Sequence, residues 1–281
     1  MKGYRVTEEL LAGFAEHLRE EERSGGTIEK YLRDVRQFSV WLGGEEATRE
    51  TTSRWKEWLL ELGYRPRTVN SMLIALNRFF IFAGWQECRT RYLRIQRQMF
   101  CIRERELTRE EYERLVETAQ DLGKKRLALL LQTICATGIR VSEVRYITVE
   151  AIQAGRADIS LKGKIRTILL PGKLCRKLVK YAKKQKIVSG EIFITRSGRG
   201  ISRRQIWAEM KALCWLAKVD PAKVFPHNLR HLFARIFYQV SRNIAQLADV
   251  LGHSSIETTR IYLVSSGAEH IRRLEQLRLI L

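Results

Sequence analysis

The chain has 281 residues, enough for two domains of ordinary size, and its 45% hydrophobic and 29% charged content is typical of a globular protein rather than a disordered or fibrous one. Its formal net charge of +20 indicates a polyanionic partner, with nucleic acid as the first candidate, because clustered Lys and Arg displace counterions from phosphate groups. No apolar run approaches the length of a membrane span, which excludes a membrane-spanning class.

The first stretch with a regular pattern, residues 7–84, predicts a helical domain. Apolar residues recur three and four positions apart, as in Leu10, Phe14 and Leu18, and glycines between such runs separate about four helices. Tryptophans at helical spacing are expected in the core rather than stacked on bases. They are Trp41, Trp55, Trp58 and Trp85.

Residues 94–106 carry many charges and have no clean period, which predicts a linker between one domain at 1–93 and a second at 107–281. The first helix of the second domain is expected to start at Thr108. The hydroxyl of Thr108 can cap the first turn while Glu111 reaches back, which is the pattern of a capping box.

Strand-like alternation appears later, at Ile159 and Leu161 and again in 165–169, where Ile165, Thr167 and Leu169 alternate. The lysine turn, Lys162-Gly163-Lys164, is expected between the two strands. A third strand is expected at 191–195, and the chain from residue 202 onward has helical periodicity. The sequence therefore predicts a mainly α fold with a small antiparallel sheet in the second domain.

The positive charge is placed unevenly along the chain. Residues 1–95 hold 16 Lys and Arg against 14 Asp and Glu, whereas residues 107–281 hold 32 against 15. An excess that serves only solubility is the alternative, but a small domain rarely needs a net charge above about 8 for that purpose. The second domain is therefore expected to face the polyanion.

The cysteines are scattered, odd in number and without a CxxC pair, so neither a disulfide framework nor a thiolate metal site is expected. They are Cys88, Cys101, Cys135, Cys175 and Cys214. The N-terminus lacks the long apolar segment of a signal peptide, and a reducing cytoplasm is the expected location.

Cleavage of a DNA phosphodiester without a metal needs a nucleophile, cations on the two non-bridging oxygens and an acid for the departing 5′ oxygen. Four segments of the second domain supply such groups. In the first, ATGIRVSEVRYI, Gly138 ends a helical run, Arg140 begins the next helix, and Glu143 lies on the same face. Glu143 can hold Arg140, although an ordinary surface ion pair is the alternative for these two residues alone.

The second segment is the lysine turn, whose tip could bring an ammonium group to a phosphate, although such a turn is often only a solvated loop. The third is PHNLRHLFARIFY, in which His227, Arg230 and His231 share one helix face. The spacing of the two histidines also suits zinc. No third ligand is near in sequence and Arg230 would repel a cation, so no metal site is expected.

The fourth segment is LADVLGHSSIETTRIYL. Gly252 closes one helix and His253 lies in the break. Ser254 with Glu257 is expected to form a capping box for a second helix, which carries Tyr262 about two turns along. A lone tyrosine on a helix is most often a packing residue, so this segment alone does not identify a nucleophile.

Taken together and in this order, GIRVSE, the lysine turn, HNLRH and LGHSSIETTRIY resemble the active-site signature of the tyrosine recombinases, close to the Xer-type resolvases and phage-type integrases. The resemblance covers about residues 107–275 and extends more weakly over the N-terminal helices. It implies a helical, SAM-like core-binding domain at 1–93 and a catalytic domain at 107–281. It further implies a recombinase that cuts and rejoins DNA at specific sites, as in the integration of a mobile element.

The resemblance also implies roles for the polar residues. Arg140 and Arg230 would clamp the scissile phosphate, with Glu143 orienting Arg140. His227 and His253 would hydrogen-bond the phosphate or move protons.

The remaining roles concern the nucleophile and the leaving group. Tyr262 would attack the phosphate to form a 3′ phosphotyrosine, with His231 in support. Lys162 would protonate the departing 5′ oxygen, and Lys164 is the alternative. The stretch 162–171 is one residue longer than in Xer resolvases, which leaves both lysines open. No metal, ATP or other cofactor is implied.

The implied partner is double-stranded DNA that contains a specific recombination site, contacted also by Lys164, Arg203 and Arg204. The implied assembly is a homotetramer on two such sites, with a monomer or weak oligomer when free, acting in the cytoplasm at the nucleoid. The tail 268–281 has apolar residues three and four apart, and is expected to dock on a neighbouring protomer or to fold back on its own domain.

Two other functions share parts of this pattern. A type IB topoisomerase uses a similar set of Arg, Lys, His and Tyr, and a catalytically silent DNA-binding regulator could keep the same fold. The linker also ends in RERELT, where many recombinases have a proline-containing segment.

Overall fold

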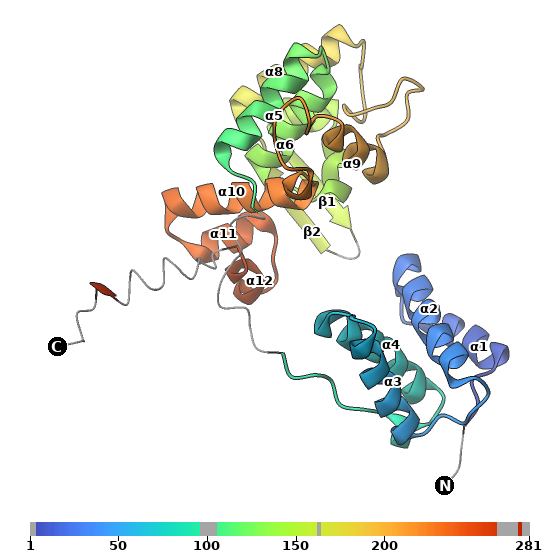
Figure 1. The fold of residues 1–281 in the computed structure, drawn as a ribbon. Coiled ribbons are helices and arrows are strands. Elements are labelled where there is room, and N and C mark those ends of the chain that lie inside the picture. The colour runs from blue at the N-terminus through green and yellow to red at the C-terminus, as the bar shows by residue number, and fades with distance from the viewer. Residues whose placement is uncertain (1–3, 96–105, 162–163, 263–274, 277–281) are drawn as a thin grey trace. The chain divides into compact units, whose positions relative to one another are not determined.

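The computed structural model describes residues 4–95, 106–161, 164–262 and 275–276. The chain divides into two compact units, Met1–Arg97 and Gln98–Leu281, which are coloured blue to teal and green to red in Figure 1. Within the described ranges, no helix combines the length and the apolar content that crossing a bilayer requires. Most of the predicted linker, 94–106, lies outside the described residues.

The first unit is helical, as predicted, with four α-helices and a 3₁₀ turn among its described residues. They are α1 (Glu8–Glu20), α2 (Gly25–Leu42), α3 (Arg49–Glu61), α4 (Pro66–Phe82) and η1 (Gln86–Cys88). Local signals set several of these ends: Thr48 caps the first turn of α3 through its hydroxyl, Gly43 ends α2 in the left-handed conformation, and Pro66 stands at the first position of α4.

An aromatic core holds the first unit together. Trp55 is fully buried and packs edge-to-face on Phe38 with ring centroids 5.1 Å apart, and Trp85 is 7% exposed. Trp41 and Trp58 pack partly buried against the same cluster. The expectation that the tryptophans belong to the core is confirmed, which argues against their use as base-stacking platforms.

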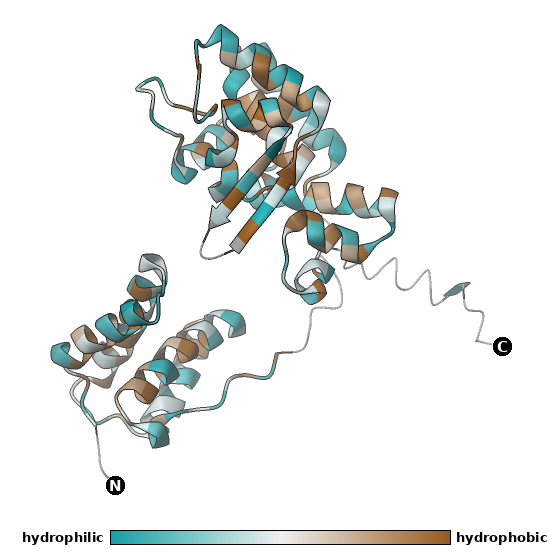
Figure 2. Cartoon of the chain, turned by 180° about the vertical axis from the view of Figure 1, so that it is seen from behind, coloured by the Kyte–Doolittle hydropathy of each residue, from teal (hydrophilic) through white to brown (hydrophobic). Residues whose placement is uncertain are grey.

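The second unit is mainly helical with one hairpin. Its elements are α5 (Arg109–Asp121), α6 (Lys125–Thr137), η3 (Val141–Tyr146), α7 (Val149–Ala154), β1 (Arg156–Leu161), β2 (Lys164–Leu169), α8 (Gly172–Lys184), α9 (Arg203–Lys211), η4 (Pro221–Lys223), α10 (Pro226–Ser241), α11 (Ile244–Leu251) and α12 (Ile256–Arg260). The predicted capping box of Thr108 and Glu111 is present at the start of α5. Figure 2 shows hydrophobic and hydrophilic residues interleaved along these elements, as amphipathic packing requires.

Two clusters of buried residues organise this unit. The larger one is centred on α6, whose Leu130, Leu131 and Ile134 are fully buried. The smaller one joins α10, α11 and the residues that follow α12, through Ala234, Leu251 and Tyr262. This second cluster places the predicted nucleophile next to the helix that carries His227 and Arg230.

The hairpin confirms the predicted antiparallel sheet but corrects two details. β1 pairs with β2 from Arg156↔Leu169 to Leu161↔Lys164, so Lys164 is the first residue of β2 rather than part of the turn. Ile165 is 82% and Leu169 is 75% exposed, whereas Ile159 and Ile168 are buried. The inward face of β2 therefore carries Arg166 and Ile168, because Ile159 lies directly across from Arg166.

The expected third strand at 191–195 is wrong. Among the described residues, this segment makes only isolated bridges, Thr148↔Glu191 and Ile194↔Gly200, and the sheet has two strands. The physical reason is that the consecutive residues Ile192 and Phe193 are both buried, so the segment crosses the core instead of presenting alternate residues to two faces.

Candidate active site

The first side chain of the site lies just beyond α6. Gly138 ends α6 in the left-handed conformation, and Arg140 follows as the residue that precedes η3. The Arg140 backbone N–H donates to Oε2 of Glu143 at 2.7 Å, and its Nη1 donates to Oε1 at 3.1 Å. The Glu143 side chain is 3% exposed and that of Arg140 is 41% exposed. This pair is therefore a buried carboxylate that orients a half-open guanidinium, not an ordinary surface ion pair.

Arg230 lies at the centre of the site, on α10. Its side chain is fully buried, and its Nη1 donates to the Gly138 carbonyl while its Nη2 donates to the Leu251 carbonyl at 2.9 Å. These oxygens are at the C-terminal ends of α6 and α11, where unpaired carbonyls and the helix dipole favour a cation. The charge of Arg230 is therefore stabilised without a carboxylate that would neutralise it.

His253 also contacts Arg230, with its Nε2 at 2.8 Å from Nη2 of Arg230. A guanidinium can only donate hydrogen bonds, so this Nε2 accepts and Nδ1 carries the proton. The Nδ1 atom lies 2.8 Å from Oγ1 of Thr259, a buried residue of α12. The contacts thus set one tautomer of His253, which lies in the break after Gly252, as predicted.

Tyr262 lies among the histidine rings. Its ring centroid is 4.4 Å from that of His231, 6.0 Å from that of His227 and 5.7 Å from that of His253, which is stacked on it with an interplanar angle of 11°. Nε of Arg230 donates to the Tyr262 hydroxyl at 3.4 Å, and the tyrosine is 4% exposed. The chain thus brings together Tyr262, Arg230 and three imidazoles.

The local structure before Tyr262 differs from the prediction in two respects. Ser255, not Ser254, caps α12, because the Ser255 backbone is extended and its hydroxyl accepts from the backbone N–H of Glu257. The helix ends at Arg260, so Tyr262 lies in the turn after α12 instead of two turns along it. Thr259 was missed, because a buried threonine in a five-residue helix has no distinctive sequence signal.

Burial and neighbouring cations keep the histidines neutral near pH 7. Burial, followed by the charges of Arg230 and Arg140, lowers the pKa of His253 to about 4. Burial, followed by the neighbouring His227, lowers the pKa of His231 to about 4. Burial, followed by the charges of Arg230 and Arg140, also lowers the pKa of His227. Neutral imidazoles can accept a proton from a phenol or hydrogen-bond a phosphate.

One further residue of the site was missed by the sequence reasoning. Arg166 of β2 has a side chain that is 15% exposed, and its Nη2 donates to Oε2 of Glu143 at 2.6 Å. Its Nη1 donates to the Leu251 carbonyl. The alternation in 165–169 assigns the wrong face to the core, which hides Arg166. A connection of only two residues between the strands would have placed Arg166 opposite Ile159, on the buried face, and this register could have identified it.

Other predicted residues are not brought into this cluster by the described contacts. Lys162 lies outside the described residues, and Lys164 is paired with Leu161, the pair next to the connection between the two strands. Arg203 and Arg204 are exposed in the first turn of α9, whose N-cap is Ser202. The predicted assembly segment, 268–281, lies outside the described residues apart from 275 and 276.

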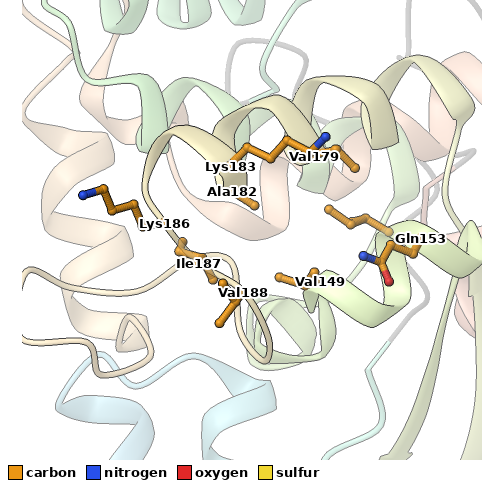
Figure 3. A pocket seen from close by; sticks show the side chains of 9 residues that line it. Val149, Gln153, Val179, Ala182, Lys183, Lys186, Ile187 and Val188 are labelled. Carbon is orange, nitrogen blue, oxygen red and sulfur yellow. The ribbon is translucent and has the colours of Figure 1, made fainter.

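A separate groove of about 420 Å³ lies between α7 and α8. Val149, Ile152, Val179 and Val188 form much of its apolar lining, with Lys183 among the polar residues (Figure 3). None of the predicted site residues lines this groove. This groove is therefore separate from the cluster around Arg230 and Tyr262.

The comparison with known families decides the assignment. The catalytic-domain model, described as the phage integrase family, matches residues 105–269. The chain belongs to the phage integrase family. A second model, the phage integrase N-terminal SAM-like domain, matches residues 11–87.

Curated relatives of this integrase-family chain are named tyrosine recombinases. Tyrosine recombinase XerA of Pyrococcus furiosus is 29% identical over 282 residues, covering 97% of this chain and 94% of the relative. Tyrosine recombinase XerD of Xanthomonas campestris is 27% identical, covering 88% and 84%. The predicted identity as a tyrosine recombinase is confirmed by these matches.

Solved structures share the fold. XerH bound to its difH substrate is similar with a TM-score of 0.69 at 19% identity, covering 95% of this chain and 84% of that one. A lambda integrase (75–356) dimer bound to a COC′ core site has a TM-score of 0.72 at 16% identity, covering 91% and 94%. The predicted two-domain, mainly helical architecture with a small sheet is thereby confirmed.

Proposed function

We propose that this protein is a site-specific DNA recombinase that cleaves and rejoins DNA strands through a covalent bond between Tyr262 and a 3′ phosphate. The observation that carries the proposal is the contact of the Tyr262 hydroxyl with buried Arg230, inside a ring of three neutral histidines. A nucleophile, a cation and proton acceptors thus converge at one point, as covalent catalysis requires.

The cleavage step follows from these positions. The Tyr262 oxygen attacks phosphorus, its proton passes to a neighbouring neutral imidazole, and the bond from phosphorus to the 5′ oxygen breaks. Arg140 and Arg230 hold the non-bridging oxygens, because guanidinium groups stabilise the charge that develops there. Lys162 supplies the proton to the 5′ oxygen, with Lys164 as the alternative donor.

Rejoining is the reverse reaction with a different strand. The 5′ hydroxyl of a partner strand attacks the phosphotyrosine, and the tyrosine leaves as a phenol that recovers its proton. The phosphotyrosine bond conserves the energy of the broken phosphodiester, so neither ATP nor a metal is required.

The two units have separate tasks in this proposal. Residues 1–93 form the core-binding domain, a proposal supported by the SAM-like match at 11–87, and residues 107–281 form the catalytic domain. Lys164, Arg203 and Arg204 contact the DNA backbone. Relatives crystallised with DNA recombination sites support double-stranded DNA as the partner. Assembly is a tetramer on two sites through the segment 268–281, in the cytoplasm at the nucleoid.

The test is covalent capture on nicked duplexes. The substrate is a pool of duplexes in which one half-site is randomised and one strand is nicked at one of a series of positions. Cleavage close to the nick releases a short fragment that carries the free 5′ hydroxyl. Once this fragment diffuses away, the phosphotyrosine cannot be resealed and stays trapped. Tyr262→Phe should retain duplex binding but lower covalent complex formation by at least about 10⁴-fold, as removal of a nucleophile does in other covalent enzymes. Complexes are measured by denaturing gel and their DNA is sequenced.

Tyr238→Phe is the matched control, because Tyr238 packs against the same small cluster. It should form the complex as the wild-type chain does. Complex formation by Tyr262→Phe would contradict the nucleophile, and a requirement for Mg²⁺ in a parallel reaction with EDTA would contradict the metal-free mechanism. Relaxation of any supercoiled plasmid without an enriched site would point to a topoisomerase instead.

A further inference from the structure

Arg166 shares hydrogen-bond acceptors with both arginines that the proposed function places on the phosphate. Its Nη2 and the Arg140 backbone N–H both donate to Oε2 of Glu143, at 2.6 and 2.7 Å. Its Nη1 and Nη2 of Arg230 both donate to the Leu251 carbonyl. The Arg166 guanidinium thus links Glu143, which orients Arg140, to the Leu251 carbonyl, which holds Arg230.

The backbone around Leu251 is shaped to admit this guanidinium. Gly252 has φ +63°, and a Cβ added there would overlap Cδ and Nη1 of Arg166. The next residue is His253, whose Nε2 meets Arg230. A change in the position of Arg166 would therefore alter the positions of Arg140, Arg230 and His253 together.

Within the described part of the chain, the Arg166 guanidinium is not fully paired in its buried position. Its Nε is buried without a hydrogen-bond partner among the described residues, which is a cost that an apolar side chain would avoid. Glu143 would keep Arg140 as an ion-pair partner if Arg166 were absent. The three guanidinium groups also outnumber the single carboxylate, which leaves net positive charge for a phosphate.

We propose that Arg166 is a positioning residue, which holds Arg140, Arg230 and His253 in the arrangement that a scissile phosphate needs. Only a planar guanidinium can donate along two fixed directions to Glu143 and to the Leu251 carbonyl at once, so lysine is a poor replacement. Because Arg166 is on β2, four residues after Lys162, the same contacts hold this strand against the cluster. The inference rests on the proposed recombinase function.

The test compares Arg166→Met with the wild-type chain on a duplex enriched by the covalent capture. A residue that acts by positioning should affect the rate of the chemical step more than duplex affinity. The single-turnover rate at saturating duplex should fall about 100-fold, the scale of an ångström-size misplacement, while duplex affinity changes little. Arg166→Lys keeps the charge and should recover only part of this rate.

Arg126→Met is the matched control. Arg126 is 22% exposed and makes the same kinds of contact, donating to a carboxylate of Glu209 at 2.6 Å and to the Ile194 carbonyl. It touches no partner of the candidate active site in these contacts. Its loss should lower thermal stability at least as much as Arg166→Met but leave the rate at saturating duplex near wild type.

A double-mutant cycle with Glu143→Gln tests the route of the effect. If Arg166 acts through Glu143, the combined variant should be less impaired than the product of the two single effects predicts. Wild-type rates in Arg166→Met, or an equal loss of rate in Arg126→Met, would overturn the positioning role while the recombinase proposal stands. Failure of the wild-type chain to form any covalent complex would overturn both. If Arg166→Met does not fold, the same comparisons are made with Arg166→Lys, and a wild-type rate there has the same meaning.

Discussion

Arg230 is a buried cation whose partners are two carbonyls, an imidazole and a phenol rather than a carboxylate. Its nearest oxygens close the C-terminal ends of α6 and α11, which supply partial negative charge without cancelling the charge of the guanidinium. A carboxylate at this place would form a neutral pair and weaken the attraction for a phosphate. This arrangement explains how the proposed phosphate-binding site can stay assembled in the absence of DNA.

The depressed pKa values of the histidines predict acid sensitivity. His231 and His253 have pKa values of about 4 in the folded chain, against an ordinary value of 6.5. Between these values the unfolded chain binds more protons than the folded chain, so the free energy of unfolding should fall as the pH decreases from about 6.5 to about 4. His231→Phe should make this decline shallower, as measured by urea denaturation across the window. An unchanged slope in that variant would mean that His231 does not contribute.

At the scale of elements, the turn between α11 and α12 decides where Tyr262, the proposed nucleophile, lies. Gly252 ends α11 with φ +63°, His253 follows, and the five-residue helix α12 returns the chain so that Tyr262 faces α10. Cluster contacts between Leu251, Ala234 and Tyr262 fasten this turn to the unit. The short helix therefore acts as a spacer that presents the tyrosine to Arg230.

Gly252→Ala should harm both stability and strand cleavage. The left-handed backbone alone should cost about 1–2 kcal/mol of the free energy of unfolding, and the added Cβ would displace Arg166 in addition. Gly155→Ala is the control, because Gly155 has φ +69° with no atom within 4 Å of an added Cβ. Denaturant unfolding should show a loss in both variants, and single-turnover cleavage should be impaired only in Gly252→Ala. Equal cleavage rates in the two variants would contradict the contact with Arg166.

At the scale of the whole molecule, the charge is divided between the units. Residues 1–95 are nearly balanced, whereas residues 107–281 carry a large excess of Lys and Arg. This asymmetry predicts that the second unit contributes most of the electrostatic attraction to a DNA backbone. Binding to DNA of any sequence should therefore depend strongly on salt.

Affinity for an arbitrary duplex should fall about 1,000-fold between 50 and 200 mM salt, as expected for roughly six phosphate contacts. Replacing Arg203 and Arg204 together by Gln should reduce the slope of log affinity against log salt by about 1 to 2. Lys183 and Lys186, which line the groove between α7 and α8, are the charge-matched control and should leave the slope unchanged when replaced by Gln. Fluorescence anisotropy over a salt series measures the affinity and its salt slope. Equal slopes for the two double variants would contradict a contact between DNA and Arg203 or Arg204.

The sequence by itself determined the features that depend on neighbours along the chain. Helical periodicity placed the four helices of the first unit, the capping box placed the start of α5 at Thr108, and glycines marked the ends of α6 and α11. The order of four polar motifs was enough to indicate the family. These signals are local, because caps, glycine conformations and amphipathic faces require only residues a few positions apart.

Only the tertiary structure decided how the site is built. Arg230 reaches the Gly138 carbonyl 92 residues away, and Arg166 reaches Leu251 across 85. The face of β2 that turns inward depends on its pairing with β1, so alternation alone pointed to the exposed side and concealed Arg166. The neutral histidines likewise follow from burial beside arginines brought from other segments. Backbone carbonyls and long-range charges leave no mark in a sequence motif, because any residue supplies a carbonyl and only packing determines which charges meet.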